Sequence, residues 1–132
     1  MKLEAIARRS DIQLEMEFIE SNYGRVLDTT HLLLQIVELK GKGKSRAELA
    51  YAAQQLIGQG LADIACEAAQ EEGILHVGFS GGVAVNRIIT KAVANHIKKY
   101  DLVPILHSFV PPGDGGISVG QVAIAAAILA EK

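Results

Sequence analysis

Two glycine-rich segments carry the residue types that could bind a phosphate group. The first, residues 80–86, reads Ser-Gly-Gly-Val-Ala-Val-Asn and joins an apolar, strand-like run, Ile74–Phe79, to an amphipathic run that begins near Val83. The start of a helix leaves backbone N–H groups unpaired and carries a partial positive charge, and glycines let an anion come close to them. We therefore expect a phosphate at Gly81 and Gly82. The alternative is that both glycines only let the helix pack closely on the strand.

The second segment, residues 111–116, reads Pro-Pro-Gly-Asp-Gly-Gly and lies between an apolar run, Leu102–His107, and a helix-like run, Ile117–Ala130. The chain therefore repeats the order strand, glycine-rich turn, helix. If the two strands are parallel neighbours, both turns open at the same edge of the sheet. We expect the two loops to face one ligand.

The polar residues of these segments indicate how such a ligand could be held. Asn86, one turn into the predicted helix, could direct its amide at a ribose or base, or could be a polar residue on a helix surface. Asp114 lies in a glycine-lined loop where a carboxylate can face a cation. The alternative for Asp114 is a turn held by Asx hydrogen bonds. Gly115 and Gly116 are the positions of this loop that we expect to contact a cofactor.

Both segments resemble the C-terminal part of the HypF-type carbamoyltransferases, which mature the nickel–iron hydrogenases, and more loosely the tRNA threonylcarbamoyl transferases. The similar residues are Ser80-Gly81-Gly82-Val83-Ala84-Val85-Asn86-Arg87 and Val110-Pro111-Pro112-Gly113-Asp114-Gly115-Gly116-Ile117-Ser118-Val119-Gly120-Gln121. The close similarity covers Leu75–Ala127, and Leu3–Ala7 resembles a mid-domain segment of those enzymes. The resemblance implies a lobe of the actin, hexokinase and Hsp70 superfold. It also implies ATP or a related nucleotide at the first segment and a divalent metal at Asp114.

The complete enzymes of that family use ATP and carbamoyl phosphate to make a carbamoyl-adenylate, and pass the carbamoyl group to a cysteine thiol of a partner protein. They hold the metal with two histidines spaced i and i+4 in the earlier half of the domain, where another phosphate loop also lies. This chain has four histidines and no such pair: His31, His76, His96 and His107. A complete carbamoyl-transfer site therefore cannot be built from one copy, and whether the isolated chain is an enzyme stays open.

Three interpretations follow. The chain is the C-terminal lobe of a HypF-like carbamoyltransferase, as a fragment, a split-gene subunit or a shortened homologue, with a separately encoded N-terminal half or a hydrogenase maturation protein as partner. Alternatively, it is a non-catalytic module that binds a nucleotide or anion through the two glycine loops. The third interpretation is an interaction protein whose apolar helices form an oligomer.

The elements that position these residues follow from hydrophobic periodicity. We predict one α/β domain over residues 1–132, with helices on both faces of a mixed sheet. In that sheet the strand Ile12–Ile19 flanks a parallel pair, Leu75–Phe79 and Val103–His107. The predicted helices are Lys2–Arg9, Asp28–Leu39, Ser45–Gly73, Val83–Lys99 and Ile117–Ala130.

The first predicted strand has an acidic face, because Glu15 and Glu17 alternate with apolar residues. These carboxylates could bind a cation, but glutamates in this pattern usually form a solvated face, and we favour that interpretation. His31 is expected in the first turn of the next helix.

Two features of the helices predict close packing and self-association. Gly58 and Gly60 weaken the long helix by about 1 kcal/mol each, which favours a closely crossing partner or a bend at that point. The run Ile117–Ala130 is apolar on nearly every side. We therefore expect a homo-oligomer, most simply a dimer, that covers this surface.

The composition excludes several classes of protein. Hydrophobic residues make up 49% of the 132 residues, which indicates a folded chain, and the net charge of −2 argues against binding to nucleic acid or an anionic membrane. Cys66 cannot form an internal disulfide because it is the one cysteine. No signal-peptide pattern begins the chain and Ile117–Ala130 is too short to span a bilayer, so we expect a cytoplasmic protein.

Overall fold

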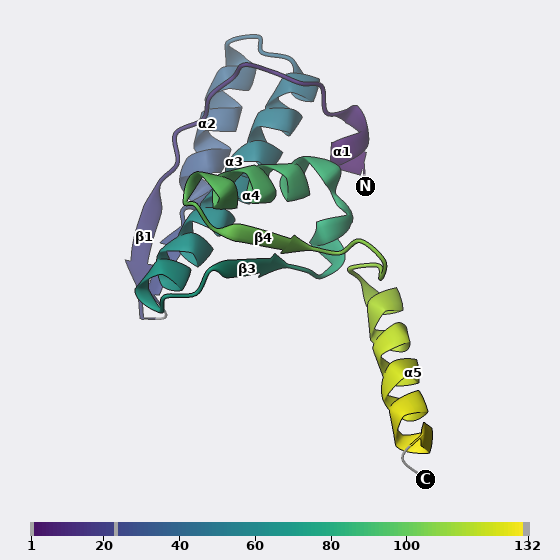
Figure 1. Ribbon diagram of the computed structural model, residues 1–132. Helices are drawn as coiled ribbons and strands as arrows, with labels where there is room; N and C mark the ends of the chain where they lie inside the picture. The colour runs from purple at the N-terminus through teal and green to yellow at the C-terminus, as the bar shows by residue number, and fades with distance from the viewer. Residues whose placement is uncertain (1, 23, 131–132) are drawn as a thin grey trace.

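Helices form most of the framework, and two pairs of short strands lie against them in the computed structural model (Figure 1). The structure describes residues 2–22 and 24–130. Its elements are α1 (Lys2–Ile6), β1 (Phe18–Ser21), β2 (Gly24–Leu27), α2 (Thr29–Gly41), α3 (Arg46–Glu71), β3 (His76–Phe79), the 3-10 turn η1 (Gly82–Val85), α4 (Arg87–Lys99), β4 (Val103–Leu106) and α5 (Asp114–Ala130).

Polar side chains cap the starts of α2 and α3, at the residues where the sequence predicts these helices to begin. The carboxylate of Asp28 accepts hydrogen bonds from the backbone N–H groups of Thr30 and His31, at the start of α2. The hydroxyl of Ser45 accepts one from Ala47 N, at the start of α3. Short side-chain oxygens at these positions replace the intrahelical partners that first-turn N–H groups lack.

The two glycines inside α3 mark close packing, as predicted, and the helix runs through both. A Cβ atom at Gly58 would lie 2.8 Å from Ala92 Cβ and 2.9 Å from the carbonyl oxygen of Ile89, both on α4. A Cβ atom at Gly60 would lie 2.7 Å from a methyl carbon of Leu27 on β2. The helix therefore needs glycine where α4 and β2 cross it.

The prediction of one mixed sheet is wrong, because the strands form two separate two-stranded sheets. The strand predicted over Ile12–Ile19 begins only at Phe18, and β1 pairs antiparallel with β2 rather than flanking β3 and β4. The preceding residues 12–17 keep the alternation of half-buried and exposed side chains but have no strand partner. The side chain of Gln35 takes that place, since it donates to Glu15 O (2.9 Å) and accepts from Glu15 N (2.7 Å).

The parallel pair predicted in the C-terminal half is confirmed. β3 and β4 pair in parallel with Phe79 opposite Leu106, and α4 connects them. One consequence is that both strands end at the same edge of the sheet, where the two glycine-rich segments follow.

Apolar residues form two clusters on either side of α3. One cluster joins α3 to α4 and the residue before β4, and consists of Ala62, Cys66, Ala69, Ile89, Val93, Ile97 and Leu102. The other joins α3 to β2 and α2, and consists of Leu27, Leu32, Ala53 and Leu56. Cys66 is fully buried and packs in the first of these clusters as a small apolar residue.

A polar group also joins α3 to α4. Asp63 Oδ1 accepts a hydrogen bond from the hydroxyl of Tyr100 (2.5 Å). The same oxygen lies 2.8 Å from His96 Nε2. Partial burial acts to raise the pKa of Asp63, but the hydrogen bonds from Tyr100 and His96 outweigh it and the pKa is lowered. The same hydrogen bond raises the pKa of Tyr100 to about 12, because a phenolate would face the carboxylate.

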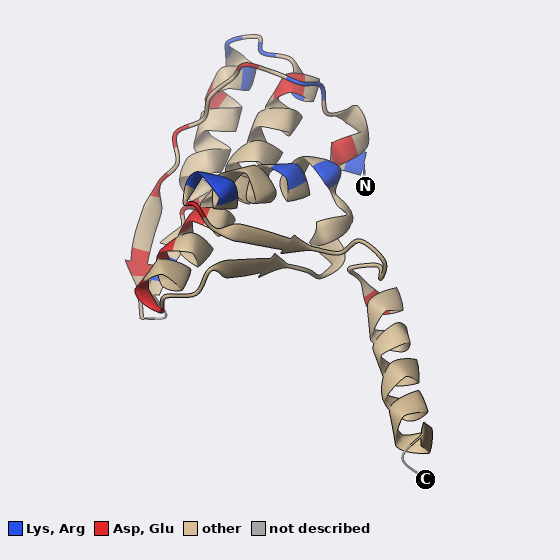
Figure 2. Cartoon of the chain, viewed as in Figure 1, with Lys and Arg blue, Asp and Glu red and all other residues tan. Residues whose placement is uncertain are grey.

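The helix α5 projects away from the other elements and buries none of its residues (Figure 1). Its single charged residue is Asp114 at its start, so the rest of the helix carries no charge in Figure 2. Large side chains such as Val122 (69% exposed) and Leu129 (70% exposed) therefore face solvent in one chain. None of the described helices is both long enough and apolar enough to span a membrane.

Candidate phosphate-binding edge

The two glycine-rich segments meet at the ends of β3 and β4, as predicted from the sequence. The backbone N–H of Gly81 donates a hydrogen bond to the carbonyl oxygen of Pro112 (3.0 Å). A cavity of about 170 Å3 lies between the segments, and its lining includes Ala84, Val85, His107 and Pro112. A second cavity, of about 330 Å3, opens beside it along the last residues of both strands.

The first segment differs from the predicted helix start. Gly81 has φ +92°, a left-handed conformation that favours glycine, and the chain then makes the 3-10 turn Gly82–Val85 before α4 begins at Arg87. The helix predicted from Val83 therefore starts four residues later. An anion at the two glycines would face the short turn rather than the N-terminus of α4.

Other parts of the chain already occupy the N-terminus of α4. The side chain of Asn86 accepts hydrogen bonds from Ile88 N (2.9 Å) and Ile89 N (3.2 Å), and Glu4 accepts one from Arg87 N (2.8 Å). These three bonds satisfy the donors that usually bind an anion at a helix start.

The donors that remain at this edge belong to the 3-10 turn. In the described part of the chain, the N–H groups of Gly82 and Val83 have no backbone acceptor, because the first bond of the turn runs from Ala84 N to Gly81 O. Nothing lies within 4 Å of a Cβ atom built on Gly82. Two neighbouring N–H groups and open space beside Gly82 are what a phosphate oxygen needs.

Asn86 is a cap rather than a residue one turn into the helix. Its side chain is 1% exposed, and its amide donates to Gln54 Oε1 on α3 (2.6 Å). Gln54 is equally buried and also donates to Ala50 O (2.8 Å). The predicted contact of Asn86 with a ribose or base stays a prediction, and in this conformation its oxygen and amide both have partners within the chain.

The second segment opens α5 three residues earlier than predicted, at Asp114. Asp114 is exposed in the first turn, and Gly115 follows it on the same edge. A Cβ atom at Gly116 would lie 2.5 Å from Pro111 O, so this position needs glycine for packing. Gly116 N also donates to Gly113 O (2.8 Å), which leaves its proposed contact with a cofactor untested.

Sequence reasoning missed one polar pair at this edge. The imidazole Nε2 of His107 lies 2.7 Å from the hydroxyl oxygen of Ser80, and both side chains are exposed. The strand register contained the signal, because Phe79 pairs with Leu106 and the next residues along the two strands are Ser80 and His107. A hydroxyl and an imidazole therefore lie at the same sheet edge as the free N–H groups of the turn.

The charges of this edge limit its chemistry. Asp114 is the one charged residue within residues 75–86 and 102–117, and the ribbon of β3 and β4 is uncharged in Figure 2. A phosphate here would be bound by backbone N–H groups, the Ser80 hydroxyl and a bridging cation, since no lysine or arginine belongs to these segments. Asp114 fits such a cation as one oxygen ligand, but within the described residues it belongs to no group of three histidine, cysteine or carboxylate side chains that could hold a metal ion.

Comparison with known proteins gives a consistent result. A family model described as "Carbamoyltransferase, Kae1-like Domain, second subdomain" matches residues 1–121. A probable carbamoyltransferase HypF of Methanocaldococcus jannaschii is 37% identical over 123 residues, which cover 92% of this chain and 16% of that protein. The carbamoyltransferase HypF of Rhizobium leguminosarum bv. viciae is 36% identical over 70 residues, 53% of this chain and 9% of the relative.

Two solved structures are similar over nearly the whole chain. The crystal structure of HypF from T. kodakarensis has a TM-score of 0.76 at 30% identity and covers 98% of this chain. A full-length HypF in the phosphate- and nucleotide-bound form has a TM-score of 0.78 at 30% identity and covers 97%. The chain spans 17% of each of these two structures.

Proposed function

The chain belongs to the HypF carbamoyltransferase family, and from this premise we propose that it forms the C-terminal lobe of a carbamoyl-transfer site and binds the phosphates of a nucleotide. The observation that carries this proposal is the meeting of the two glycine segments at the ends of β3 and β4, with free N–H groups at Gly82 and Val83. A similar HypF structure is described as phosphate- and nucleotide-bound, which supports the choice of ligand.

Each residue of the edge has a defined part in the proposed site. The N–H groups of Gly82 and Val83 bind phosphate oxygens, and Ser80, oriented by His107, donates its hydroxyl to the same group. Asp114 supplies one ligand to a divalent cation that would screen the phosphate charge. Gly81 and Gly116 act through the backbone, because they let the two segments approach each other.

The reaction that we propose for the assembled site is that of the family. Hydrolysis of carbamoyl phosphate gives carbamate and phosphate, and the carbamate displaces pyrophosphate from ATP to form a carbamoyl-adenylate. A cysteine thiol of a partner protein then loses its proton, takes the carbamoyl group and releases AMP. This lobe contributes nucleotide contacts and one cation ligand, while the remaining ligands come from the part of the enzyme that this chain does not span. The cytoplasm is the proposed location.

Exposed apolar surface and unpaired sheet edges support a site that is completed by another part of the enzyme. Exposed apolar residues of this sheet include Ile105 in β4 (55% exposed) and Leu75 just before β3 (64% exposed), and both sheet edges lack further strands among the described residues. We propose that the other half of the domain covers this sheet and α5, which completes a lobe of the actin, hexokinase and Hsp70 superfold. Apolar patches of this kind are rare on monomers.

When that half is absent, we propose that a second copy of the chain covers α5. Light scattering of the purified chain at micromolar concentration should then give twice the monomer mass of 14.1 kDa. Addition of a separately produced N-terminal half should convert the homodimer into a heterodimer. A mass of one chain at all concentrations would contradict the proposal.

Calorimetric titration with ATP, with and without Mg2+, tests the phosphate site directly. We expect weak, saturable binding that Mg2+ strengthens and that Gly82→Val abolishes, because the added side chain fills the phosphate position. Gly82 is the position of choice because it has open space and no positive φ, so the fold tolerates the change. Gly120→Val, also in open space but on α5, is the matched control and should bind as the unmodified chain does. Equal affinity in Gly82→Val, or no binding by any form, would overturn the site in this lobe.

A further inference from the structure

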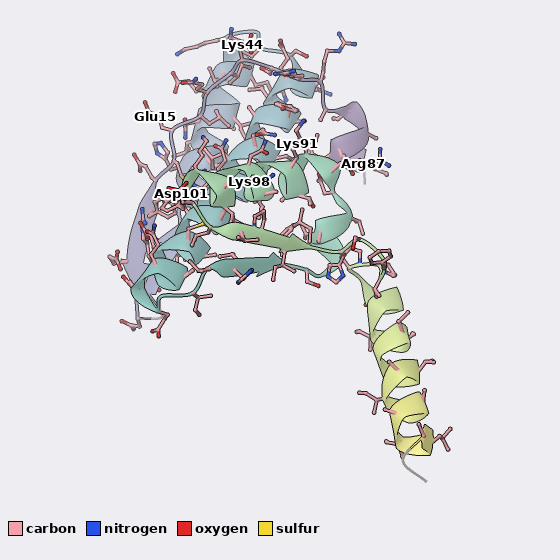
Figure 3. All side chains as sticks on the ribbon, in the orientation of Figure 1. Glu15, Lys44, Arg87, Lys91, Lys98 and Asp101 are labelled. Atoms are coloured by element: carbon pink, nitrogen blue, oxygen red, sulfur yellow. The ribbon has the colours of Figure 1, made fainter. Side chains whose placement is uncertain are left out.

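A second group of chemically competent side chains lies away from the phosphate-binding edge. Glu15 and Glu17, before β1, and His31, in the first turn of α2, come together on the side of the molecule where Figure 3 labels Glu15. This side is well separated in the view from the ends of β3 and β4 (Figure 1). We propose that these three residues bind a divalent transition metal ion, with Zn2+ as the natural occupant.

The geometry of the group suits one small ion. His31 Nε2 lies 3.9 Å from an oxygen of Glu15, and His31 Nδ1 lies 3.4 Å from an oxygen of Glu17. One ligand atom from each residue can be chosen so that all three lie within 4.8 Å of one another. Ligands bound to the same Zn2+ at about 2.0–2.2 Å are separated by about 3–4 Å, so small rotations of the two glutamates complete the site.

The backbones of all three ligands are held in place by hydrogen bonds. Glu15 makes two bonds with the side chain of Gln35, and Glu17 O accepts one from Asp28 N (2.8 Å). The carboxylate of Asp28 in turn accepts from His31 N (3.1 Å). The alternation of half-buried and exposed side chains over residues 12–17 puts both glutamates on one side. The backbone positions of the ligands are therefore fixed on two packed segments, and the exposed glutamate side chains are free to adjust to an ion.

The imidazole supplies an independent observation. His31 Nε2 is buried from solvent and has no hydrogen-bond partner within the described residues. A buried nitrogen without a partner destabilises the fold, and a metal ion bound to that nitrogen would remove the penalty. The glutamate oxygen nearest to Nε2 is too distant for a hydrogen bond but is placed to share such an ion.

The donor set selects the class of metal. One imidazole nitrogen with two carboxylates favours Zn2+ and neighbouring transition ions, whereas Mg2+ and Ca2+ prefer oxygen ligands alone. Three protein ligands leave a fourth position for water or for a group from a partner. The competing explanation is an ion pair between protonated His31 and the glutamates, which would bind no metal.

Titration of the metal-free chain with Zn2+ separates these explanations, and Co2+ absorption gives a second readout that needs no enzymatic activity. We expect one equivalent to bind, with at least tenfold weaker binding in Glu17→Gln and in His31→Gln. His76→Gln and Glu72→Gln are the matched controls, since they remove one exposed histidine and one exposed carboxylate that belong to neither site, and Asp114→Asn reports any ion held at the phosphate-binding edge. Circular dichroism checks that each variant is folded.

The outcomes are distinct for the two sites. Zn2+ binding that is unchanged by Glu17→Gln and His31→Gln, or absent from the unmodified chain, overturns this proposal and leaves the phosphate site unaffected. Loss of binding only in Asp114→Asn would assign the ion to the phosphate-binding edge instead.

Discussion

Replacement of Asn86 by alanine should destabilise the fold severely although the residue lies in a loop motif. The change removes the cap of α4, which is worth about 1 kcal/mol, and leaves Gln54 Oε1 buried without a donor, which costs about 1–3 kcal/mol. The expected loss in the free energy of unfolding is therefore roughly 2–4 kcal/mol.

Two further variants separate the cap from the interhelical bond. Asn86→Ser keeps a short oxygen that can accept from Ile88 N but removes the amide donor to Gln54, so about 1–3 kcal/mol should be lost. Gln54→Met leaves the Asn86 amide unpaired and should cost a similar amount. The double variant should cost less than the sum, because both single changes break the same bond.

Urea unfolding followed by circular dichroism measures these differences, since the midpoint and slope give the free energy of unfolding. The reasoning is refuted if the free energy of unfolding of Asn86→Ala lies within about 0.5 kcal/mol of that of the unmodified chain, which is the range of ordinary surface changes. Additive costs in the double variant would show that Gln54 and Asn86 do not interact. If the double variant confirms the bond between Asn86 and Gln54, a loss of nucleotide binding in any Asn86 variant must first be checked against a loss of folding.

Two other predictions concern the contacts of α3 with α4: the close packing at Gly58, compared with a glycine in open space on α5, and the hydrogen bond from Tyr100 to Asp63. Gly58→Ala should destabilise the chain by up to about 2 kcal/mol, because overlap with Ala92 and the α4 backbone outweighs the better helix propensity; Gly120→Ala, in open space, should stabilise it by up to about 1 kcal/mol. Urea unfolding tests both, and an equally stable Gly58→Ala would contradict the packing. The raised pKa of Tyr100, about 12 against 10.0, means that the protonated hydroxyl stabilises the fold below pH 10 and that this support is lost as the pH rises toward 12. Tyr100→Phe should flatten the alkaline loss of stability, and an unchanged pH profile would exclude the hydrogen bond to Asp63 as its source.

Local sequence patterns were sufficient to predict much of the structure of this protein. Helix caps at Asp28 and Ser45, and the parallel pair β3 and β4, follow from signals within a few residues of each element. The meeting of the two glycine segments also follows from the sequence, because a right-handed crossover through α4 brings both strand ends to one edge. The family was recognisable from the same segments.

Contacts between distant segments required the tertiary structure. The alternation over residues 12–17 is that of a strand, yet Gln35 on α2 bonds to its backbone and no strand pairs with it. Asn86 reads as a ligand residue in its motif, and only the position of Gln54, 32 residues earlier, makes it a buried cap.

The same reason explains the group formed by Glu15, Glu17 and His31. Their spacing in the sequence matches no metal-binding motif, because the ligands come from an extended segment and a helix that packing on α3 brings together. Periodicity reports which face of one segment is apolar, but it contains no information on which segment will cover that face. Hydrogen bonds and ligand groups made across such contacts are therefore set by the packing of the folded chain.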